Sequence, residues 1–206
     1  GAMNFGKRTD EAESKRIIAR AVELGVTHID TANAYTDGNS ERIVGEAVKG
    51  RDGVTVATKC GFGRMAGGKP EGLSPARLRA ALDESLERMK LEYVDLYYLH
   101  VPDHATPIEE TLDAVAELLE TKKIRSWGIS NYGAWQVLEM MMLRPNMPRP
   151  VIAQHLYNTL IRELDVTVLP NTAAPGWSFH TSASCAPLSI STCGSRSSAA
   201  AGVITG

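Results

Sequence analysis

The sequence predicts an α/β fold, namely an incomplete (β/α)8 barrel of the TIM-barrel type with about six recognisable βα units. Three observations support this prediction. Between residues 10 and 165, short apolar runs alternate with helical patterns, as in βα units around a parallel sheet. The apolar runs are continuous, so both faces of each strand should be buried. No Gly-x-Gly-x-x-Gly turn follows any strand, which favours a barrel over a doubly wound sheet.

Five strands are expected in order along the chain, each short, apolar and rich in β-branched or aromatic residues. They are "GVTHID" at 25–30, "GVTVATK" at 53–59, "YVDLYYLH" at 93–100, "IRSWGIS" at 124–130 and "PVIAQ" at 150–154. A sheet of such strands needs cover on both sides, as the strands of a barrel have.

Two of the helices between these strands have recognisable starts. Ser74-Pro75 offers an N-cap and a first-turn proline, and "TPIE" at 106–109 predicts a capping box that begins at Thr106. After each start, apolar residues recur at helical spacing and define a buried face. These residues are Leu78, Leu82, Leu86 and Met89 in the first helix, and Leu112, Val115 and Leu119 in the second.

Composition and charge favour a soluble protein that acts on a small molecule. Of 206 residues, 43% are hydrophobic and 22% charged, which is typical of a globular domain. Lysine and arginine number 22 against 24 acidic residues, with no basic stripe, so neither nucleic acid nor membrane is an expected partner. No secretory signal or bilayer-length apolar run is present. Three cysteines without metal or disulfide spacing suit a reducing compartment, so we expect a cytoplasmic protein.

Polar residues occur where the expected strands end. They are Asp30, Lys59, His100, the pair Ser130 and Asn131, and Gln154. Each has an ordinary structural explanation on its own, such as a turn cap for Asp30 or a buried core position for His100. In a barrel, however, the carboxyl ends of the strands surround one mouth, so these side chains should meet in one pocket.

An Asp, a Tyr, a Lys and a His at one mouth can together polarise a carbonyl group. Tyr35 would donate the proton, since an ammonium at Lys59 favours phenolate and lowers a tyrosine pKa from about 10. Asp30 would hold Lys59 in place and keep it charged, and a neutral His100 would orient the carbonyl substrate. No residue supplies hydride, so a reduced nicotinamide is required. Hydrogen bonds for its carboxamide are available from Ser130, Asn131 and Gln154.

At these residues the sequence resembles the aldo-keto reductases. The motifs "DTANAY", "ATKCGF", "LYYLHVPD", "KIRSWGISNY" and "AQHLYN" occur in that family's order, and "GAMNFGKRTD" is similar to the aflatoxin aldehyde and succinic semialdehyde reductase branch. The match covers roughly residues 1 to 170, and the segment 1–3 resembles the end of the family's first strand.

The resemblance implies an NADPH-dependent reductase of small aldehydes or ketones, without a metal. Its catalytic residues would be Asp30, Tyr35, Lys59 and His100, and its cofactor-binding residues Met3, Asp30, Ser130, Asn131 and Gln154. The branch also implies a homodimer of the parent protein. A non-catalytic NADP(H)-binding regulatory subunit on the same fold, as in the potassium-channel beta subunits, is the alternative, and an inactive fragment is another.

The sequence departs from the family pattern at two places. Lys122 stands where a helix-ending glycine is common, at a cost of order 1 kcal/mol if the position is left-handed. Within the single domain expected over 1–206, residues 171–198 are atypical and read as irregular coil, either a reading-frame or splicing error or a genuine insertion, before a family-like end at 199–206. A complete barrel needs about 250 residues, so we expect this chain to bind NADPH more weakly than an intact relative.

Overall fold

The computed structural model describes residues 1–156 and 178–182. Six parallel strands pair in the order β1-β2-β3-β4-β5-β6 within this part of the chain. They are β1 His28–Asp30, β2 Thr55–Cys60, β3 Val94–Leu99, β4 Ile124–Ser130, β5 Ile152–Leu156 and β6 Ser178–Ser182. Strand order that follows chain order, with a helix between successive strands from β1 to β5, is the connectivity of a (β/α)8 barrel.

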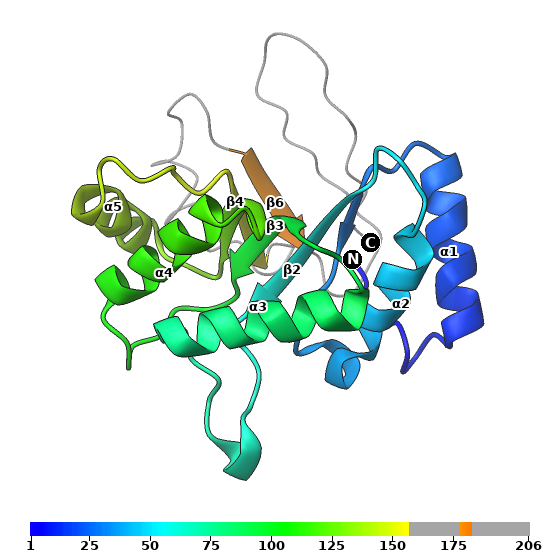
Figure 1. Ribbon diagram of the computed structural model, residues 1–206, viewed down its shortest axis with the longest axis horizontal. Coiled ribbons are helices and arrows are strands. Elements are labelled where there is room, and N and C mark those ends of the chain that lie inside the picture. Colours follow the sequence, from blue (N-terminus) through cyan, green and yellow to red (C-terminus); the bar gives the residue numbers. More distant parts are fainter. Residues whose placement is uncertain (157–177, 183–206) are drawn as a thin grey trace, which may run out of the picture.

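The helices lie along one face of the sheet, which curls into a half-barrel (Figure 1). They are α1 Glu11–Glu23, α2 Asn39–Val48, α3 Pro75–Met89, α4 Ile108–Glu120 and α5 Ala134–Leu143, and two short 3-10 turns, η1 Tyr35–Gly38 and η2 Ala66–Gly68, follow β1 and β2. The incomplete barrel predicted from the sequence is therefore confirmed, and all five expected strands are present. No helix in the described ranges is long and apolar enough to cross a bilayer.

One part of the coil prediction for 171–198 is wrong. Residues 178–182 form β6, which pairs in parallel with β5 from Ile152 opposite Ser178 to Leu156 opposite Ser182. The unpaired edge of β5 offers a row of main-chain donors and acceptors, and "SFHTS" contains the β-favouring residues Phe179 and Thr181. The rest of the predicted irregular segment and the family-like end lie outside the described residues.

The two faces of the sheet bury different side chains. A large hydrophobic core lies between the strands and the helices and includes Ile43, Leu82, Val115 and Ile129. A small second cluster of Ala57, Leu96, Tyr98 and Ile152 lies on the opposite, inner face of the curled sheet. Side chains alternate between the faces along a strand, so the inner face is set by the even-numbered positions of β3, β4 and β5 and the odd-numbered positions of β2.

Gly128 allows the inner cluster to pack closely. A Cβ atom at Gly128 would lie 2.6 Å from Ile152 Cγ2 and 2.9 Å from Tyr98 Cε1, closer than side-chain atoms can approach. The absence of a side chain at this position of β4 lets the Tyr98 ring lie across the strand beside Ile152.

The expected helix starts agree with the structure at one helix and differ at the other. The Ser74 hydroxyl oxygen accepts the Arg77 amide at 3.4 Å, and Pro75 opens α3. The capping box at Thr106 is wrong, because α4 begins after Pro107 and the Thr106 hydroxyl donates to Asp103 Oδ2 at 2.7 Å. Asp103 also accepts the Leu73 and Ala105 amides, so its carboxylate organises the connection between β3 and α4 and takes up the hydroxyl.

Lys122, just after α4, has a φ angle of 59°, so this family glycine position is left-handed in the chain. Lys90, at the end of α3, has a φ angle of 57°. A non-glycine residue in this conformation costs of order 1 kcal/mol. The chain tolerates this cost at two helix ends.

Candidate active site

The polar residues at the strand ends lie on the inner face of the half-barrel. Lys59 is two positions after Ala57, which belongs to the inner cluster. Tyr98 lies opposite Lys59 in the register of β2 and β3. His100 is two positions after Tyr98, and Gln154 is two positions after Ile152. Strand alternation therefore directs these side chains toward the same mouth, at the carboxyl ends where barrel active sites lie.

Lys59 and Asp30 form a buried ion pair at this mouth. The Lys59 ammonium donates to Asp30 Oδ1 at 2.5 Å and to the Thr31 carbonyl oxygen at 2.9 Å, and the Lys59 side chain is fully buried. Burial lowers the pKa of Lys59, while the Asp30 carboxylate raises it in part compensation. Asp30 Oδ2 is buried without a hydrogen-bond partner among the described residues.

Tyr35 lies over this ion pair at the start of η1. The Lys59 ammonium is 5.1 Å from the centre of the Tyr35 ring. The two residues after it, Thr36 and Asp37, have φ angles of 49° and 55°, a conformation that is costly for non-glycine residues. The Thr36 hydroxyl donates to the Phe5 carbonyl oxygen at 2.8 Å, which ties the strained turn to the N-terminal segment.

The expected lowering of the Tyr35 pKa by Lys59 is wrong for this structure. Burial of the phenol raises its pKa, and the Asp30 carboxylate raises it further. The Lys59 ammonium does not reverse this rise in pKa, because the Asp30 carboxylate in direct contact with it offsets its charge. Tyr35 is therefore held as a protonated hydroxyl, which is the form that can donate a proton.

His100 lies between two aromatic rings at the same mouth. Its ring centre is 5.8 Å from that of Tyr35 in an edge-to-face arrangement and 5.1 Å from that of Phe62. Burial, with a further contribution from the Lys59 charge, lowers the pKa of His100 to about 4. The imidazole is therefore neutral near pH 7, as expected from the sequence. Its Nδ1 atom is buried without a hydrogen-bond partner in the described part of the chain.

Tyr35, Lys59, Asp30 and His100, which we call the lysine cluster, are thus brought together as the sequence predicted. The other predicted residues lie beside it. The Asn131 side-chain amide donates to the His100 carbonyl oxygen and to the Ser130 hydroxyl, each at 3.1 Å. Ser130 and Gln154 lie opposite each other in β4 and β5.

Met3 lies on the other side of the cluster. The Ala2 amide before it donates to the Asp30 carbonyl oxygen at 2.8 Å, which places the segment 1–3 against the end of β1 as the family resemblance implied. The Met3 side chain itself is 51% exposed. Met3 is therefore next in the chain to a residue that bonds Asp30, with its own side chain open to solvent.

A carboxamide fits the residues at this edge. Gln154 was expected to end its strand but lies in the middle of β5, which continues to Leu156. Its half-buried side chain has no hydrogen-bond partner among the described residues, and Ser130 is buried next to it. The unpaired Asp30 Oδ2 is a further acceptor at the same mouth. The Ser130 hydroxyl and the Gln154 amide can form hydrogen bonds with an amide of a ligand, and Asp30 Oδ2 can accept one from a ligand hydroxyl group.

A second group of polar residues was not predicted. The buried Glu71 carboxylate accepts the Gly61 and Gly63 amides on Oε2, at 2.9 and 3.1 Å, and the Asn33 side-chain amide on Oε1 at 2.6 Å. Arg77 Nε donates to the same Oε1 at 2.9 Å. We call these residues the glutamate clamp. A lone glutamate in a glycine-rich loop carries no sequence signal, because its partners come from three separate elements.

Phe62 was also missed. Its side chain is 63% exposed even though its ring contacts His100. Its place three residues after Lys59 was the available signal, since a residue that follows a strand in a barrel lies at the mouth.

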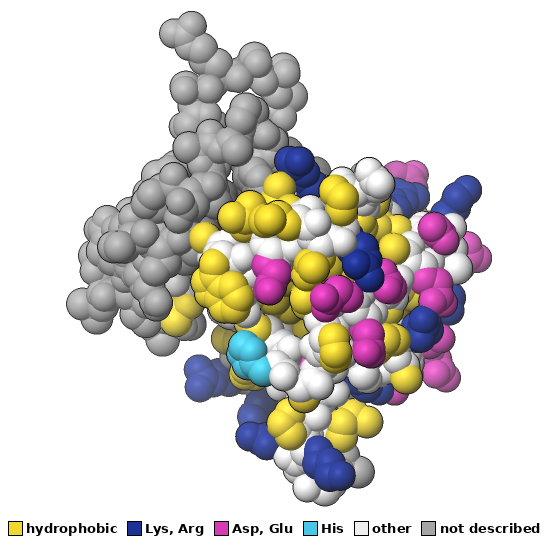
Figure 2. Space-filling view, turned by 90° about the vertical axis from the view of Figure 1, so that its left-hand side faces the viewer, with side chains coloured by type: hydrophobic (Ala, Val, Ile, Leu, Met, Phe, Trp, Pro, Cys, Tyr) yellow, Lys and Arg dark blue, Asp and Glu magenta, His cyan; other side chains and the backbone are white. Residues whose placement is uncertain are grey.

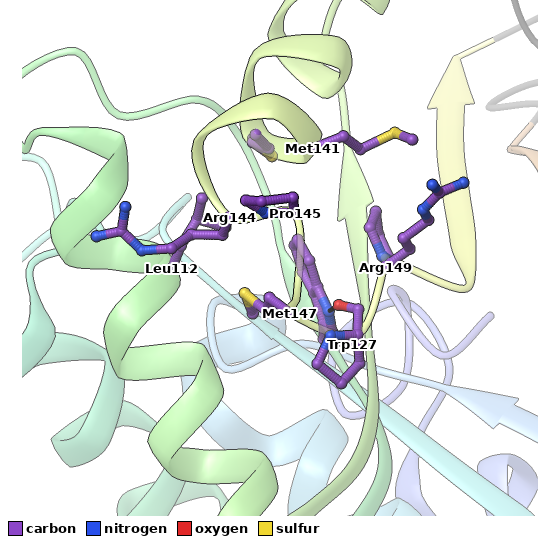
Figure 3. A pocket seen from close by; sticks show the side chains of 10 residues that line it. Leu112, Trp127, Met141, Arg144, Pro145, Met147 and Arg149 are labelled. Atoms are coloured by element: carbon purple, nitrogen blue, oxygen red, sulfur yellow. Dashed lines mark hydrogen bonds between the residues drawn. The ribbon is translucent and has the colours of Figure 1, made fainter.

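Two cavities lie away from the lysine cluster. One of about 10 Å³, between α4, α5 and residues 144–150, is lined by Leu112, Trp127, Met141, Arg144 and Met147 among others (Figure 3). Its volume holds about one water molecule, and the Trp127 indole bonds the Pro148 carbonyl oxygen at 2.7 Å. The other, of about 190 Å³, lies between the loops after β3 and β4 and α5. Neither is lined by a residue of the lysine cluster.

The outer side of α5 is apolar and exposed. Figure 2 shows hydrophobic side chains gathered over this side of the molecule, and Trp135, Leu138 and Met142 are the large exposed ones on α5. In a closed barrel every helix is flanked by two others, and α4 flanks α5 on one side.

A parallel half-barrel with a tyrosine, a buried lysine–aspartate pair and a histidine at its mouth defines an α/β-barrel protein of the kind that binds its ligands at the strand ends. The chain belongs to the aldo/keto reductase family, whose family model matches residues 1–173. Among the described residues, no group of three or more His, Cys, Asp or Glu side chains is placed to hold a metal ion.

Several characterised proteins are similar to this chain. Aflatoxin B1 aldehyde reductase member 2 of Homo sapiens is 38% identical over 176 residues, covering 82% of this chain and 48% of that protein. L-glyceraldehyde 3-phosphate reductase of Escherichia coli (strain K12) is 36% identical over 177 residues, covering 82% and 51%. The chain therefore spans about half the length of the curated relatives it matches.

Solved structures support the same fold. The holo form of an aldo-keto reductase from Bacillus halodurans superimposes with a TM-score of 0.75 at 34% identity, covering 88% of this chain and 59% of that chain. At this identity, the likeness extends to sequence as well as to fold.

Proposed function

We propose that the protein reduces small aldehydes or ketones to alcohols, with NADPH as the hydride donor and Tyr35 as the proton donor. The observation that carries this proposal is the convergence of four side chains from three strands and one turn on one mouth, with the Lys59 ammonium 5.1 Å from the Tyr35 ring centre and the His100 ring 5.8 Å from it. Reductases among the relatives support the reaction class.

The charges of the lysine cluster suit proton donation. Burial and the Asp30 carboxylate keep the pKa of Tyr35 high, so the hydroxyl holds its proton until charge develops on a substrate oxygen. The Lys59 ammonium then stabilises the phenolate that remains after proton transfer. His100, neutral because burial lowers its pKa to about 4, donates a hydrogen bond to the same oxygen and fixes its position.

Residues on the other side of the mouth would hold the nicotinamide. Ser130, Asn131 and Gln154 would bind its carboxamide, and Asp30 and Met3 would contact the rest of the cofactor, with Asp30 Oδ2 free to accept a hydrogen bond. When bound, the reduced nicotinamide supplies the hydride that none of these side chains can provide. The preference for the 2'-phosphorylated nucleotide rests on the family resemblance.

The test is NADPH oxidation by the full-length protein with a series of small aldehydes. We expect turnover that depends on the aldehyde, and little with NADH. Tight NADPH binding without turnover of any aldehyde or ketone would instead support a regulatory nucleotide-binding subunit on the same fold.

A further inference from the structure

We propose that Tyr98 is a positioning residue for Lys59, because its ring holds the buried ammonium in place and keeps it charged for the reaction. This inference rests on the proposed function, since Lys59 acts in the same site. It starts from the contact of two aromatic rings with one cation. The Lys59 ammonium lies 5.1 Å from the centre of the Tyr35 ring and 5.3 Å from the centre of the Tyr98 ring.

Tyr98 contacts Lys59 because the two residues are neighbours in the sheet. Lys59 pairs with Tyr98 between β2 and β3, and Tyr98 pairs with Gly128 between β3 and β4. Gly128 in turn pairs with Ile152 of β5. Because Gly128 has no side chain, the Tyr98 ring can lie against β4, where a Cβ atom would come within 2.9 Å of Tyr98 Cε1. The register of four strands therefore fixes the ring beside the ammonium.

The two adjacent tyrosines of β3 have different environments. Tyr97 belongs to the large core on the helix side of the sheet, and its hydroxyl donates to the Leu78 carbonyl oxygen at 3.2 Å. Tyr98 belongs to the inner cluster, and it contacts the Lys59 ammonium with its ring. Side chains alternate between the faces along a strand, so only the second tyrosine can act on Lys59.

The Lys59 ammonium needs support beyond its hydrogen bonds. Of its three N–H groups, two donate to Asp30 Oδ1 and to the Thr31 carbonyl oxygen. The Lys59 side chain is fully buried, and burial lowers its pKa. The face of an aromatic ring is partly negative and attracts a cation within about 6 Å of the ring centre, most strongly where water is excluded. Tyr98 therefore opposes the loss of the proton from Lys59.

A neutral ring suits this position better than a second carboxylate. The Asp30 carboxylate already contributes to the raised pKa of Tyr35, and a further negative charge would oppose the phenolate that forms on proton transfer. Burial raises the pKa of the Tyr98 phenol, so Tyr98 itself stays uncharged. Tyr98 thus stabilises the ammonium without making proton donation by Tyr35 harder.

Other groups around Lys59 also influence its charge. They are Asp30 from β1, Tyr35 from η1, Glu41 from α2, His100 just after β3 and the amino group of Gly1. All of these groups are unchanged in variants at position 98, so a difference in the Lys59 pKa between such variants reports the ring. Loss of the ring should lower the Lys59 pKa by about one pH unit, or about tenfold in the protonation equilibrium.

The first experiment measures the Lys59 pKa in the full-length protein by NMR titration of the Lys59 Cε signal, assigned by its loss in Lys59→Met. The pKa should be about one pH unit lower in Tyr98→Leu than in the unaltered protein, and it should be unchanged in Tyr98→Phe, which keeps the ring. Tyr97→Leu, which removes an equally buried ring from the other face of β3, is the matched control and should leave the pKa unchanged. Equal pKa values in Tyr98→Leu and the unaltered protein overturn the proposal.

A fluorinated series keeps the proposal testable if Tyr98→Leu does not fold. Phenylalanine and its analogues with one, two and three ring fluorines are introduced at position 98. They keep the shape of the ring and weaken the negative charge on its face stepwise. The Lys59 pKa should fall with each added fluorine. A pKa that is constant across the series overturns the proposal.

The second experiment connects the contact to the reaction through the pH dependence of kcat with butanal. Turnover should fall on the alkaline side as Lys59 loses its proton, and this fall should begin about one pH unit lower in Tyr98→Leu than in Tyr98→Phe, with little change in KM. A fall at the same pH in both variants overturns the role in the reaction. If no aldehyde is reduced but the NMR contrast is present, the reductase function fails and the positioning of Lys59 by Tyr98 stands.

Discussion

The lysine cluster and the glutamate clamp are both buried, charged and close to the ends of β1 and β2, but their carboxylates differ in how fully they are bonded. Asp30 uses Oδ1 for Lys59 and leaves Oδ2 without a partner among the described residues. Glu71 uses both oxygens, for two amides, one side-chain amide and one guanidinium. Buried groups are normally satisfied, so the free Asp30 oxygen can still accept a hydrogen bond from a ligand, whereas both Glu71 oxygens are already occupied.

The pKa values show the same contrast. Burial of Glu71 would raise its pKa, but the Gly61 and Gly63 amides and Arg77 outweigh it and lower the pKa overall. In the lysine cluster, burial dominates, so the pKa of Lys59 falls and that of Tyr35 rises. The clamp keeps its charge, whereas the cluster is poised to exchange a proton.

The largest expected effect separates the two groups by function. Tyr35→Phe in the full-length protein should reduce aldehyde turnover by about 100-fold to 10,000-fold, because it removes the proton donor. NADPH affinity and the urea midpoint should change little, since the hydroxyl is not part of the ion pair. Steady-state kinetics and fluorescence titration measure both. Turnover that stays within threefold would show that another group supplies the proton.

The second effect separates them by stability. Glu71→Ala should lower the free energy of unfolding by about 3 to 4 kcal/mol, because it leaves two buried amides and part of the Arg77 charge unpaired. Urea denaturation of the chain measures it. Glu84→Ala is the control, since Glu84 also pairs with Arg77 but is 45% exposed, and it should cost no more than about 1 kcal/mol. Equal losses in the two variants would remove the distinction between clamp and surface pair.

The third effect depends on pH. The folded-state pKa of His100 is lowered to about 4, below its unfolded value near 6.5, so the unfolded chain binds the proton first. The contribution of the neutral His100 to the free energy of unfolding is therefore fully present above pH 6.5, and it is lost as the pH falls toward 4. Between pH 7 and pH 5, the free energy of unfolding of the unaltered chain should fall by about 2 kcal/mol more than that of the His100→Gln variant.

Urea midpoints at the two pH values check this prediction. The depressed pKa of Glu71 places its own loss of stability below about pH 4.5, outside this interval, so the clamp does not contribute to the difference. His155, whose pKa burial also lowers, is common to both proteins and cancels. An equal change in urea midpoint for the two proteins between pH 7 and pH 5 would mean that the pKa of His100 is not lowered in the folded state.

The smallest expected effect is on stability, at Lys122, which lies outside both the lysine cluster and the glutamate clamp. Lys122→Gly should raise the free energy of unfolding by about 1 kcal/mol, because glycine adopts the left-handed conformation found there without the Cβ penalty. Thermal denaturation should show the gain, and turnover should not change. A loss of stability would mean that the Lys122 side chain makes a stabilising contribution that outweighs its backbone cost.

The sequence by itself determined the strands, their parallel pairing and the residues of the lysine cluster. The reason is local, since side chains alternate along a strand and polar residues such as Lys59 and His100 stand out at the ends of apolar runs. Once the strands are parallel, their carboxyl ends share one edge, and residues 30, 59 and 100 must meet there. The family resemblance marked Lys122 as a glycine position, and the structure shows that it is left-handed.

The tertiary structure alone decided the glutamate clamp, the exposed ring of Phe62, β6 and the direction of the Tyr35 pKa. Glu71 draws its partners from the β1–η1 turn, the β2 end and α3, and no sequence spacing encodes such a meeting. The strand at 178–182 forms because β5 has an edge to pair with. The Tyr35 pKa rises because burial and the contact between Lys59 and Asp30 act together, and both depend on three-dimensional distances that the linear chain does not specify.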